Sequence, residues 1–496
     1  MKTLLLTTFF LSLAFLSQSQ FIYFNEEYNN DLNSGATGIF ETDFGYRIGG
    51  WSEVEENGYG MRKMLISTID FEGNLLSWKT YGGYGLQYFV SLFGAFTKLS
   101  DGGYTLCGTI MNEDESAAFL MRLDPNGDSL WIRTYFDDIT PQDTLYVPFV
   151  CRELPDKGLI LAGQVHNSPG GDNNFLMRTD SLGNKLWVNQ YGVDGWSDGA
   201  VSVTLLPDGG FLAGTVRLSP LNNFIANSGL LKTDSLGNMI WLKFYGGEYE
   251  DGTSVVTLAD DGNYLVGSTY AVYEYYPGYP EQRAWIFKTD TSGNVLWDKT
   301  YARCNFMGFC TKIEELDDGC ILASGLASYT GGFGTYGWIL KTDNNGDSLW
   351  MHDYSLYPED ENYLHNYTLT SDGGIILTGC TFGPPLHVSS LWVEKLDTLG
   401  QIMGIGEEGH TEVKECGDIL MWPNPCHDYL NIELLKSKGE WDYQLIIFDF
   451  TGREIISMTF TGVQRISVNK LKPGIYFAVI KNDSGVIKSS KFEVCR

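Results

Sequence analysis

Apolar and polar residues alternate along most of the chain in short runs, which are separated by clusters of Asp, Gly and Asn. Alternation with a period of two, bounded by such turn residues, predicts β-strands and hairpins rather than helices. In one representative stretch we expect four strands, at residues 200–206, 211–215, 229–233 and 239–245. The Asp208-Gly209-Gly210 turn joins the first two strands, because Asp accepts backbone N–H groups and Gly tolerates positive φ.

This four-strand pattern recurs at intervals of 53 to 56 residues. Its clearest signature is a turn followed by Trp, as in DSLGNKLW from Asp180 and DSLGNMIW from Asp234. Such turns begin at Asp70, Asp124, Asp180, Asp234, Asp290, Asp343 and Asp397, and shorter Asp-Gly turns lie between them. Repeated units of four antiparallel strands predict an all-β fold, a seven-bladed β-propeller of four-stranded blades over residues 20–406.

The order of strands at the chain ends indicates how the ring closes. The last unit has Gly404 where the other units place Trp, so it lacks a good fourth strand. Residues 21–24 are apolar and precede a polar loop, and we expect them to supply that strand. Closure in this way would remove exposed sheet edges, whereas a linear solenoid is the alternative.

The repeated turns and tryptophans admit a structural and a functional interpretation. The turns are similar to the Asp-box of sialidase propellers but one residue longer, and the calcium order D-x-[DN]-x-[DN]-G is absent. We therefore expect structural hairpin turns, with bound metal as the alternative. We expect blade packing, rather than ligand contact, from Trp131, Trp187, Trp241, Trp297 and Trp350.

Composition narrows the class of protein and its partners. The 496 residues are 43% hydrophobic and 14% aromatic, which is too apolar for a disordered acidic chain. Asp and Glu number 62 against 33 Lys and Arg, a net charge of −29. Such an excess repels phosphate, so we expect neither nucleic-acid binding nor attraction to an anionic membrane.

The N-terminus has the pattern of a secretory signal peptide, residues 1–19. Lys2 precedes a short apolar run that ends in Ser17-Gln18-Ser19. The run is too short to span a bilayer, and no other segment predicts a transmembrane helix. Export permits disulfides among the nine cysteines. Cys304 with Cys310 is a plausible bridge, as are two of Cys416, Cys426 and Cys495, and buried free thiols are the alternative.

The connections of variable length should share one face, opposite the Asp-Gly turns, and we expect an extracellular ligand there. The longest predicted loop is residues 269–283, stiffened by Pro277 and Pro280. Its tyrosines, together with one Trp in a shorter loop, could stack on sugar rings or contact a protein. These candidate ligand-binding residues are Tyr270, Tyr273, Tyr275, Tyr276, Tyr279 and Trp196.

Acidic residues also gather in these loops. The candidate metal ligands are Asp194, Asp198, Glu250 and Asp251, which could hold Ca²⁺ if they converge around an axis. The alternative is a solvated acidic rim. Neither a cofactor nor a catalytic residue is identified, because nucleophile, P-loop and zinc motifs are absent. A glycosidase-like or sialidase-like enzyme and a surface scaffold remain alternatives to a binding protein.

The repeat ends near Gly406, and a polar linker at residues 407–417 leads into a near-neutral segment, residues 418–496. Short predicted strands there indicate a small Ig-like β-sandwich. Its ordered motifs are Trp422-Pro423-Asn424-Pro425, the hairpin IIFDFTGREI, the turn LKPGIYF with Pro473, Gly474 and Tyr476, and the closing KSSKFEV. They resemble the C-terminal type A sorting domain of type IX secretion substrates.

The resemblance implies a route and a partner. Substrates of this family cross the inner membrane of a Gram-negative cell by their signal peptide. The type IX secretion machinery then exports them across the outer membrane through the sorting domain. The passenger is released or attached to the cell surface. The resemblance does not specify what the passenger binds.

Overall fold

The structure is a computed structural model, which describes residues 23–112, 116–135, 144–167, 171–192, 196–218, 226–247, 251–276, 279–328, 334–357, 360–383, 388–401, 419–422, 429–434, 443–449, 453–460, 463–482 and 485–494. The predicted signal peptide and linker lie outside these residues. The chain divides into two compact units, Met1–Tyr301 with Asn305–Glu408, and Ala302–Cys304 with Gly409–Arg496. Each is described by itself.

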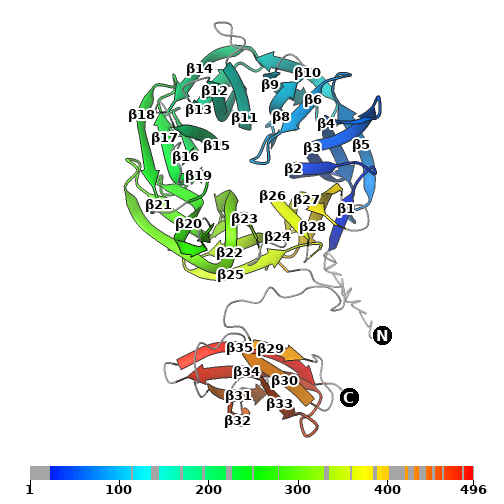
Figure 1. The fold of residues 1–496 in the computed structure, drawn as a ribbon, viewed down its shortest axis with the longest axis vertical. Helices are drawn as coiled ribbons and strands as arrows, with labels where there is room; N and C mark the ends of the chain where they lie inside the picture. Colours follow the sequence, from blue (N-terminus) through cyan, green and yellow to red (C-terminus); the bar gives the residue numbers. More distant parts are fainter. Residues whose placement is uncertain are drawn as a thin grey trace, which may run out of the picture. The chain divides into compact units, whose positions relative to one another are not determined.

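The described elements of the first unit are all strands, arranged in radial groups around a central axis (Figure 1). Three sheets have four consecutive antiparallel strands each. The first contains β2 (Ser34–Thr42), β3 (Gly45–Glu56), β4 (Tyr59–Ile69) and β5 (Leu75–Tyr81). The second contains β11 (Thr144–Glu153), β12 (Leu159–Asn167), β13 (Gly171–Thr179) and β14 (Lys185–Tyr191). The third contains β15 (Ser197–Leu205), β16 (Phe211–Leu218), β17 (Ala226–Thr233) and β18 (Met239–Tyr245).

A fourth sheet differs because its innermost strand is broken in two. Both β6 (Gln87–Val90) and β7 (Phe96–Lys98) pair with β8 (Tyr104–Met111), which continues to β9 (Ser116–Leu123) and β10 (Ser129–Tyr135). The residues between β6 and β7 therefore leave the sheet. They include Phe93 and Gly94, whose φ of 86° suits a glycine.

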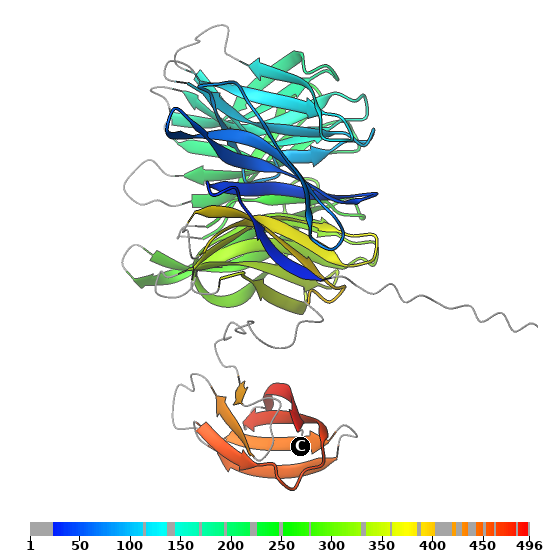
Figure 2. The ribbon, with the colours of Figure 1, turned by 90° about the vertical axis from the view of Figure 1, so that its right-hand side faces the viewer.

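The remaining strands form one eleven-stranded sheet. It begins with β19 (Val255–Leu258), β20 (Tyr264–Tyr276) and β21 (Tyr279–Thr289), followed by the long β22 (Val295–Glu315). The first half of β22 pairs with β21 and its second half with β23 (Ile321–Ser328). The sheet continues through β24 (Thr335–Thr342), with β25 (Ser348–Tyr354) beside it, to β26 (Glu361–Leu369), β27 (Ile375–Phe382), β28 (Ser389–Leu396) and β1 (Phe24–Tyr28). The fold is thus an all-β propeller, whose strands run between two faces (Figure 2).

The N-terminal strand completes the last four-strand group, as the sequence predicts, because β1 pairs antiparallel with β28. The predicted position of this strand was wrong: it covers residues 24–28 rather than 21–24. Phe24 lies against Gly73 as Trp241 lies against Gly293, and Tyr28 corresponds to Tyr245. The aromatic side chain at each end of the strand therefore sets the alignment.

A tyrosine at the end of each outer strand joins its group to the next. The Tyr191 hydroxyl donates to the carbonyl of Gly237, 2.6 Å away, in the turn between β17 and β18. Seven such bonds, of 2.5 to 2.8 Å, occur among the described residues. Their donors are Tyr28, Tyr81, Tyr135, Tyr191, Tyr245, Tyr301 and Tyr354. Because Tyr28 lies in the N-terminal strand, these bonds complete a circle.

The repeated tryptophans pack over the same turn glycines, as predicted. The ring of Trp187 lies so close to Gly237 that a Cβ there would come within 2.8 Å of it. Gly237 also has a φ of 79°, so a side chain would be strained as well as crowded. In the first sheet Trp78 stands one position nearer its Tyr than in the others, and Ile66 and Arg47 approach Gly127 instead.

The Asp turns are structural, which favours the first of the two interpretations. Asp234 Oδ1 accepts the backbone N–H groups of Leu236 (2.9 Å) and Asn238 (2.8 Å), while Oδ2 accepts the Asn238 side chain. These bonds, that from the Asn238 side chain foremost, hold the pKa of Asp234 below its usual value. The carboxylate is thereby occupied with its own turn.

Of the two cysteines in the predicted Cys304–Cys310 bridge, only Cys310 has a described side chain. Cys310 is buried and free, in agreement with the alternative interpretation. Burial raises the pKa of its thiol, so it behaves as a small apolar side chain.

The second unit consists of two sheets around one core. One sheet contains β29 (Ile419–Trp422), β30 (Tyr429–Leu434) and β33 (Val463–Ser467). The other contains β32 (Glu454–Phe460), β31 (Tyr443–Asp449), β34 (Gly474–Asn482) and β35 (Gly485–Val494). Ile432 from the first sheet and Ile447 from the second belong to the same buried cluster.

A buried carboxyl group interrupts the core of the first unit. Glu394 in β28 is fully buried, at a position where other groups place Met177, Leu231 or Leu340. Neither of its carboxyl oxygens has a hydrogen-bond partner among the described residues. Burial raises its pKa to about 8, so the side chain is protonated at neutral pH.

Replacing Tyr191 by Phe should lower the free energy of unfolding by about 1 kcal/mol, because the carbonyl of Gly237 loses one of its two donors and keeps only the Asn189 side chain. Denaturant unfolding of the purified protein measures the change. The matched control is Tyr59→Phe, at a side chain that is 73% exposed. Equal stability of the two variants would contradict a structural role for the Tyr–Gly bond.

Replacing Glu394 by Leu should stabilise the protein more at pH 8 than at pH 5. The unfolded carboxyl ionises above about pH 4.5, whereas the folded one stays protonated until about pH 8, so stability falls as pH rises between these values. We expect the gain to grow by roughly 3 kcal/mol over this range. Glu394→Gln, which does not titrate, should remove the same pH dependence, and an unchanged slope in both variants would contradict burial of the acid.

Candidate functional site

The face opposite the Asp-Gly turns, which carries the connections of variable length, is called the variable-loop face. It contains a hairpin where the sequence predicts a loop. The predicted loop at residues 269–283 was wrong, since β20 extends to Tyr276 and β21 starts at Tyr279. The several Tyr residues and Val272 favour strands, and the pairing Tyr276↔Tyr279 continues the ladder to its tip. Tyr273, Tyr275, Tyr276 and Tyr279 lie in this hairpin, but their side chains are outside the described part of the chain.

The two remaining aromatic candidates are packed into the protein. Tyr270 contacts Trp285 edge to face, with ring centroids 5.3 Å apart, and belongs to a buried cluster. Trp196 is half-buried and lies under the Arg217 guanidinium, 5.3 Å from its ring centroid. Arg217 also stacks on Phe244 at 3.6 Å. These contacts give both residues structural roles, which the sequence pattern does not separate from ligand contact.

The four predicted metal ligands are not brought together as a described site. Asp194 and Glu250 lie outside the described residues. Asp198 is fully buried and accepts two hydrogen bonds from Arg217, at 2.9 and 3.2 Å. Asp251 is also buried, and its oxygens accept the backbone N–H groups of Gly247 and Ala271. Burial raises the pKa of Asp251 to about 6 despite these bonds. Within the described ranges, no cluster of three His, Cys, Asp or Glu could hold a metal ion.

A groove between the sheet of β2–β5 and the sheet of β6–β10 carries two exposed tyrosines on the variable-loop face. Its volume is about 610 Å³. Tyr59, at the start of β4, is 73% exposed, and Tyr84, in the connection from β5 to β6, is 71% exposed. The other lining residues are Glu56, Asn57, Gly60, Met61, Gly85, Gln87, Met111 and Asn112. Exposed rings beside amide and carboxylate groups form a surface suited to a polar ligand with flat apolar faces.

Buried contacts hold the groove in place. Lys63 is almost fully buried and pairs with Glu56 at 2.7 Å. The Lys63 ammonium also donates to the carbonyls of Gly83 and Leu86, at 2.7 and 3.0 Å. Glu56 accepts the backbone N–H of Gly85, which lowers its pKa together with the bond from Lys63. The connection that carries Tyr84 is thereby fixed to the β3–β4 hairpin.

The sequence contains a weak signal for this groove. Tyr84 lies between Gly83 and Gly85, and Tyr59 lies between Gly58 and Gly60, so both rings flank residues without side chains. Such neighbours leave an aromatic ring uncovered. The signal is weak because the two segments are more than twenty residues apart, and only the pairing of sheets places them together.

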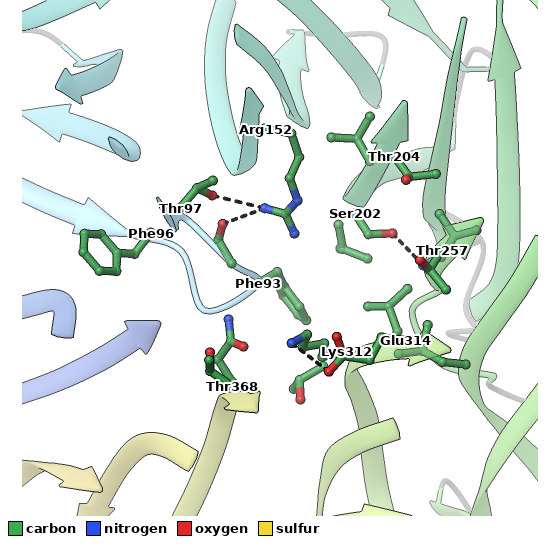
Figure 3. Close-up of a pocket in the computed structure, with 18 of the residues that line it drawn as sticks. Phe93, Phe96, Thr97, Arg152, Ser202, Thr204, Thr257, Lys312, Glu314 and Thr368 are labelled. Atoms are coloured by element: carbon green, nitrogen blue, oxygen red, sulfur yellow. Dashed lines mark hydrogen bonds and ion pairs between the residues drawn. The ribbon is translucent and has the colours of Figure 1, made fainter. Parts of the chain in front are cut away.

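A second cavity of about 310 Å³ lies in the central channel (Figure 3). Its walls come from the inner strands β2, β7, β11, β15, β19, β22 and β26, near their ends at the Asp-Gly turns. Threonine hydroxyls and valine methyl groups alternate along these walls. The charged lining residues are Lys98, Arg152, Lys312 and Glu314, of which sequence inspection identified none.

Neither cavity assembles a pair of carboxylates for glycoside hydrolysis. Among the described lining residues, Glu314 is the acidic group of the channel and Glu56 that of the groove. His365 is buried in β26, where it contacts the carbonyl of Ala36 at 2.7 Å, and burial lowers its pKa to about 4. It lines neither of these two cavities.

The sorting motif can be placed in part. Pro423, Asn424 and Pro425 lie outside the described residues, as does the side chain of Trp422 at the end of β29. Pro473 is exposed directly before β34, whose first residue is Gly474, and the Tyr476 hydroxyl donates to the carbonyl of Lys472 at 2.9 Å. This bond fixes the turn in the way a tyrosine corner does. Among the described residues, no helix has the length and apolar character needed to cross a membrane.

Comparison with protein families supports the predicted route. Residues 420–494 match the family described as "Secretion system C-terminal sorting domain". This match indicates secretion of the chain by the type IX system, to the cell surface or beyond. No curated protein matches the chain.

Several solved structures are similar in fold at low identity. The extracellular domain of a putative hybrid two-component system from B. thetaiotaomicron is 10% identical, with a TM-score of 0.43 over 93% of this chain and 55% of that one. The chain thus spans about half the length of that relative. A polysaccharide lyase, the PL25 ulvan lyase, is 6% identical, with a TM-score of 0.49 over 75% and 96%. The β-propeller domain of the Trilobed protease from Pyrococcus furiosus is 6% identical, with a TM-score of 0.40 over 73% and 95%.

Asp198→Ala should lower the free energy of unfolding by about 3 kcal/mol, because it leaves the Arg217 guanidinium without its buried partner. Melting with Ca²⁺ and with a chelator separates this ion pair from a metal site. We expect the two melting temperatures of the unmodified protein to agree. A Ca²⁺-dependent rise that Asp198→Ala abolishes would instead support the predicted calcium site.

Proposed function

We propose that this protein is a secreted or surface-attached propeller that binds an extracellular glycan through the variable-loop face. In this proposal residues 1–19 are a cleaved signal peptide, residues 20–406 form seven blades, and residues 407–417 are a linker. Residues 418–496 form an Ig-like sandwich that the type IX machinery recognises. The seven circular Tyr–Gly bonds and the match at residues 420–494 support this organisation.

The observation that carries the binding proposal is the groove with Tyr59 and Tyr84. Large exposed aromatic side chains are costly to leave in water, and two of them flank one groove. The C–H faces of a sugar ring stack on such rings, while hydroxyl groups bond to polar side chains such as Gln87. Because Lys63 holds the groove in shape, binding requires little reorganisation.

The tyrosine hairpin of β20 and β21 is a second possible contact on the same face, and a protein ligand is the alternative occupant. Glycosidase-like or sialidase-like activity would need a second carboxylate near Glu56. The described lining residues of the groove include none. Binding is therefore the function that the geometry supports best, and no cofactor is required for it.

Glycan arrays probed with the full mature chain test the proposal. Binding should fall at least tenfold in Tyr59→Ala and in Tyr84→Ala, which corresponds to about 1.4 kcal/mol for each ring. Phe44→Ala, at an exposed aromatic residue in the turn between β2 and β3, is the matched control and should bind normally. Blank arrays, or equal binding by all variants, would refute the groove as a glycan site.

A further inference from the structure

The central channel has a charge opposite to that of the protein as a whole. The chain has a net charge of −29, yet the cavity at the turn end of the channel is lined by three cationic side chains and one carboxylate. These are Lys98, Arg152, Lys312 and Glu314. Charges of one sign in a confined cavity concentrate small ions of the other sign.

The carboxylates next to the lining residues are occupied elsewhere. Glu153 and Glu315 are the last residues of the inner strands β11 and β22, and Glu41 is the last but one of β2. Each accepts a backbone N–H group of a neighbouring turn, from Ser371, Ser100 and Asp260 respectively, at 2.6 to 2.7 Å. They therefore link adjacent groups of strands at the mouth, and none of them lines the cavity.

Arg152 is held in place with part of its guanidinium available. Nη1 donates to the carbonyl of Cys151 at 2.8 Å, to Thr97 Oγ1 at 3.2 Å and to the carbonyl of Gly94 at 3.4 Å. Each bond described for this side chain uses Nη1, so Nη2 and Nε can donate to a ligand. The planar guanidinium suits the two oxygens of a carboxylate.

Lys312 lines the same cavity from β22. Its ammonium lies 4.2 Å from the ring centroid of Tyr367 and donates to the Tyr367 carbonyl at 3.1 Å. Glu314 lies 3.1 Å away and offsets part of the charge. The charges of Lys312 and Glu314 cancel, so Arg152 and Lys98 give the cavity lining a net positive charge.

The remaining surface fits an organic ligand better than a bare ion. Thr204, Thr257 and Thr368 contribute hydroxyl groups to the lining (Figure 3), and that of Thr368 can accept a bond while it donates to the carbonyl of Ile39. The lining also includes the apolar residues Val203 and Val255. The Phe93 loop between β6 and β7 also contributes to the lining, so the cavity has an aromatic side. Its volume of about 310 Å³ is within the range of small-molecule sites.

We propose that the central channel binds a small organic carboxylate, of the size of a sugar acid, through Arg152 and Lys312. The carboxylate pairs with the guanidinium and the ammonium, and its hydroxyl groups bond to the threonines. This site lies at the turn end of the channel, whereas the Tyr59–Tyr84 groove lies on the variable-loop face, so the proposal does not depend on glycan binding.

Titration calorimetry of the full mature chain with sodium glucuronate and with glucose tests the channel site. Glucuronate should bind with saturation, and glucose should bind at least tenfold more weakly, because it lacks the charge. Raising NaCl should weaken glucuronate binding. Absence of saturable heat with glucuronate, or equal binding of the two sugars, would overturn the proposal.

Two channel variants locate the site. Arg152→Gln and Lys312→Met should each weaken glucuronate binding at least tenfold. Lys79→Met on the outer strand β5, at an exposed lysine, is the matched control and should bind normally. If Arg152→Gln does not fold, as judged by circular dichroism, Lys312→Met decides. Unchanged binding in the folded channel variants, or loss in Tyr59→Ala, would place the carboxylate elsewhere and overturn the proposal.

Discussion

The hydrogen bond from a tyrosine hydroxyl to a turn glycine carbonyl joins each group of four strands to the next. A group of four strands has two apolar faces and is not stable alone, so it must pack against neighbours on both sides. The Tyr–Gly bond fixes the distance and angle of that packing at the outer edge, and the adjacent Trp or Phe fills the space over the glycine. Tyr28 extends the same bond to the first group and so makes the chain a ring.

The ring separates two kinds of position. The outer edge and the Asp turns are occupied by repeated contacts and therefore vary little among the groups. The long connections on one face and the inner strands around the axis are free of these contacts. Tyr59 and Tyr84 lie at the long connections of one face. Arg152 and Lys312 lie on the inner strands around the axis. Both cavities thus lie away from the repeated Tyr–Gly contacts.

The buried acidic side chains of the ring differ in the partners that compensate their burial. Asp198 is paired with Arg217. Asp251 accepts two backbone N–H groups, which offset only part of the cost of its burial. Glu394 has no such partner and stands where the other groups have apolar side chains. It lies in β28, next to the N-terminal strand that closes the ring. The stability of the strand group that closes the ring therefore depends on pH.

The sequence alone determined the features that depend on neighbouring residues. The Asp turns and the alternating strands follow from local propensity, and the repeat makes them unambiguous. The packing role of Trp187 also follows, because one residue type recurs at one position. The position of β1 was wrong because a single copy without Trp does not show which aromatic residue replaces it.

Only the tertiary structure decided which side chains share a cavity. Tyr270 and Trp196 have the composition of ligand-binding residues, yet they are covered by Trp285 and Arg217, which come from other strands. Tyr59 and Tyr84, and likewise Arg152 and Lys312, are distant in sequence and meet only because successive groups are rotated around one axis. The repeated residues determine how each group packs on the next and therefore the rotation between them. The side chains that differ between repeats become neighbours only in the folded ring.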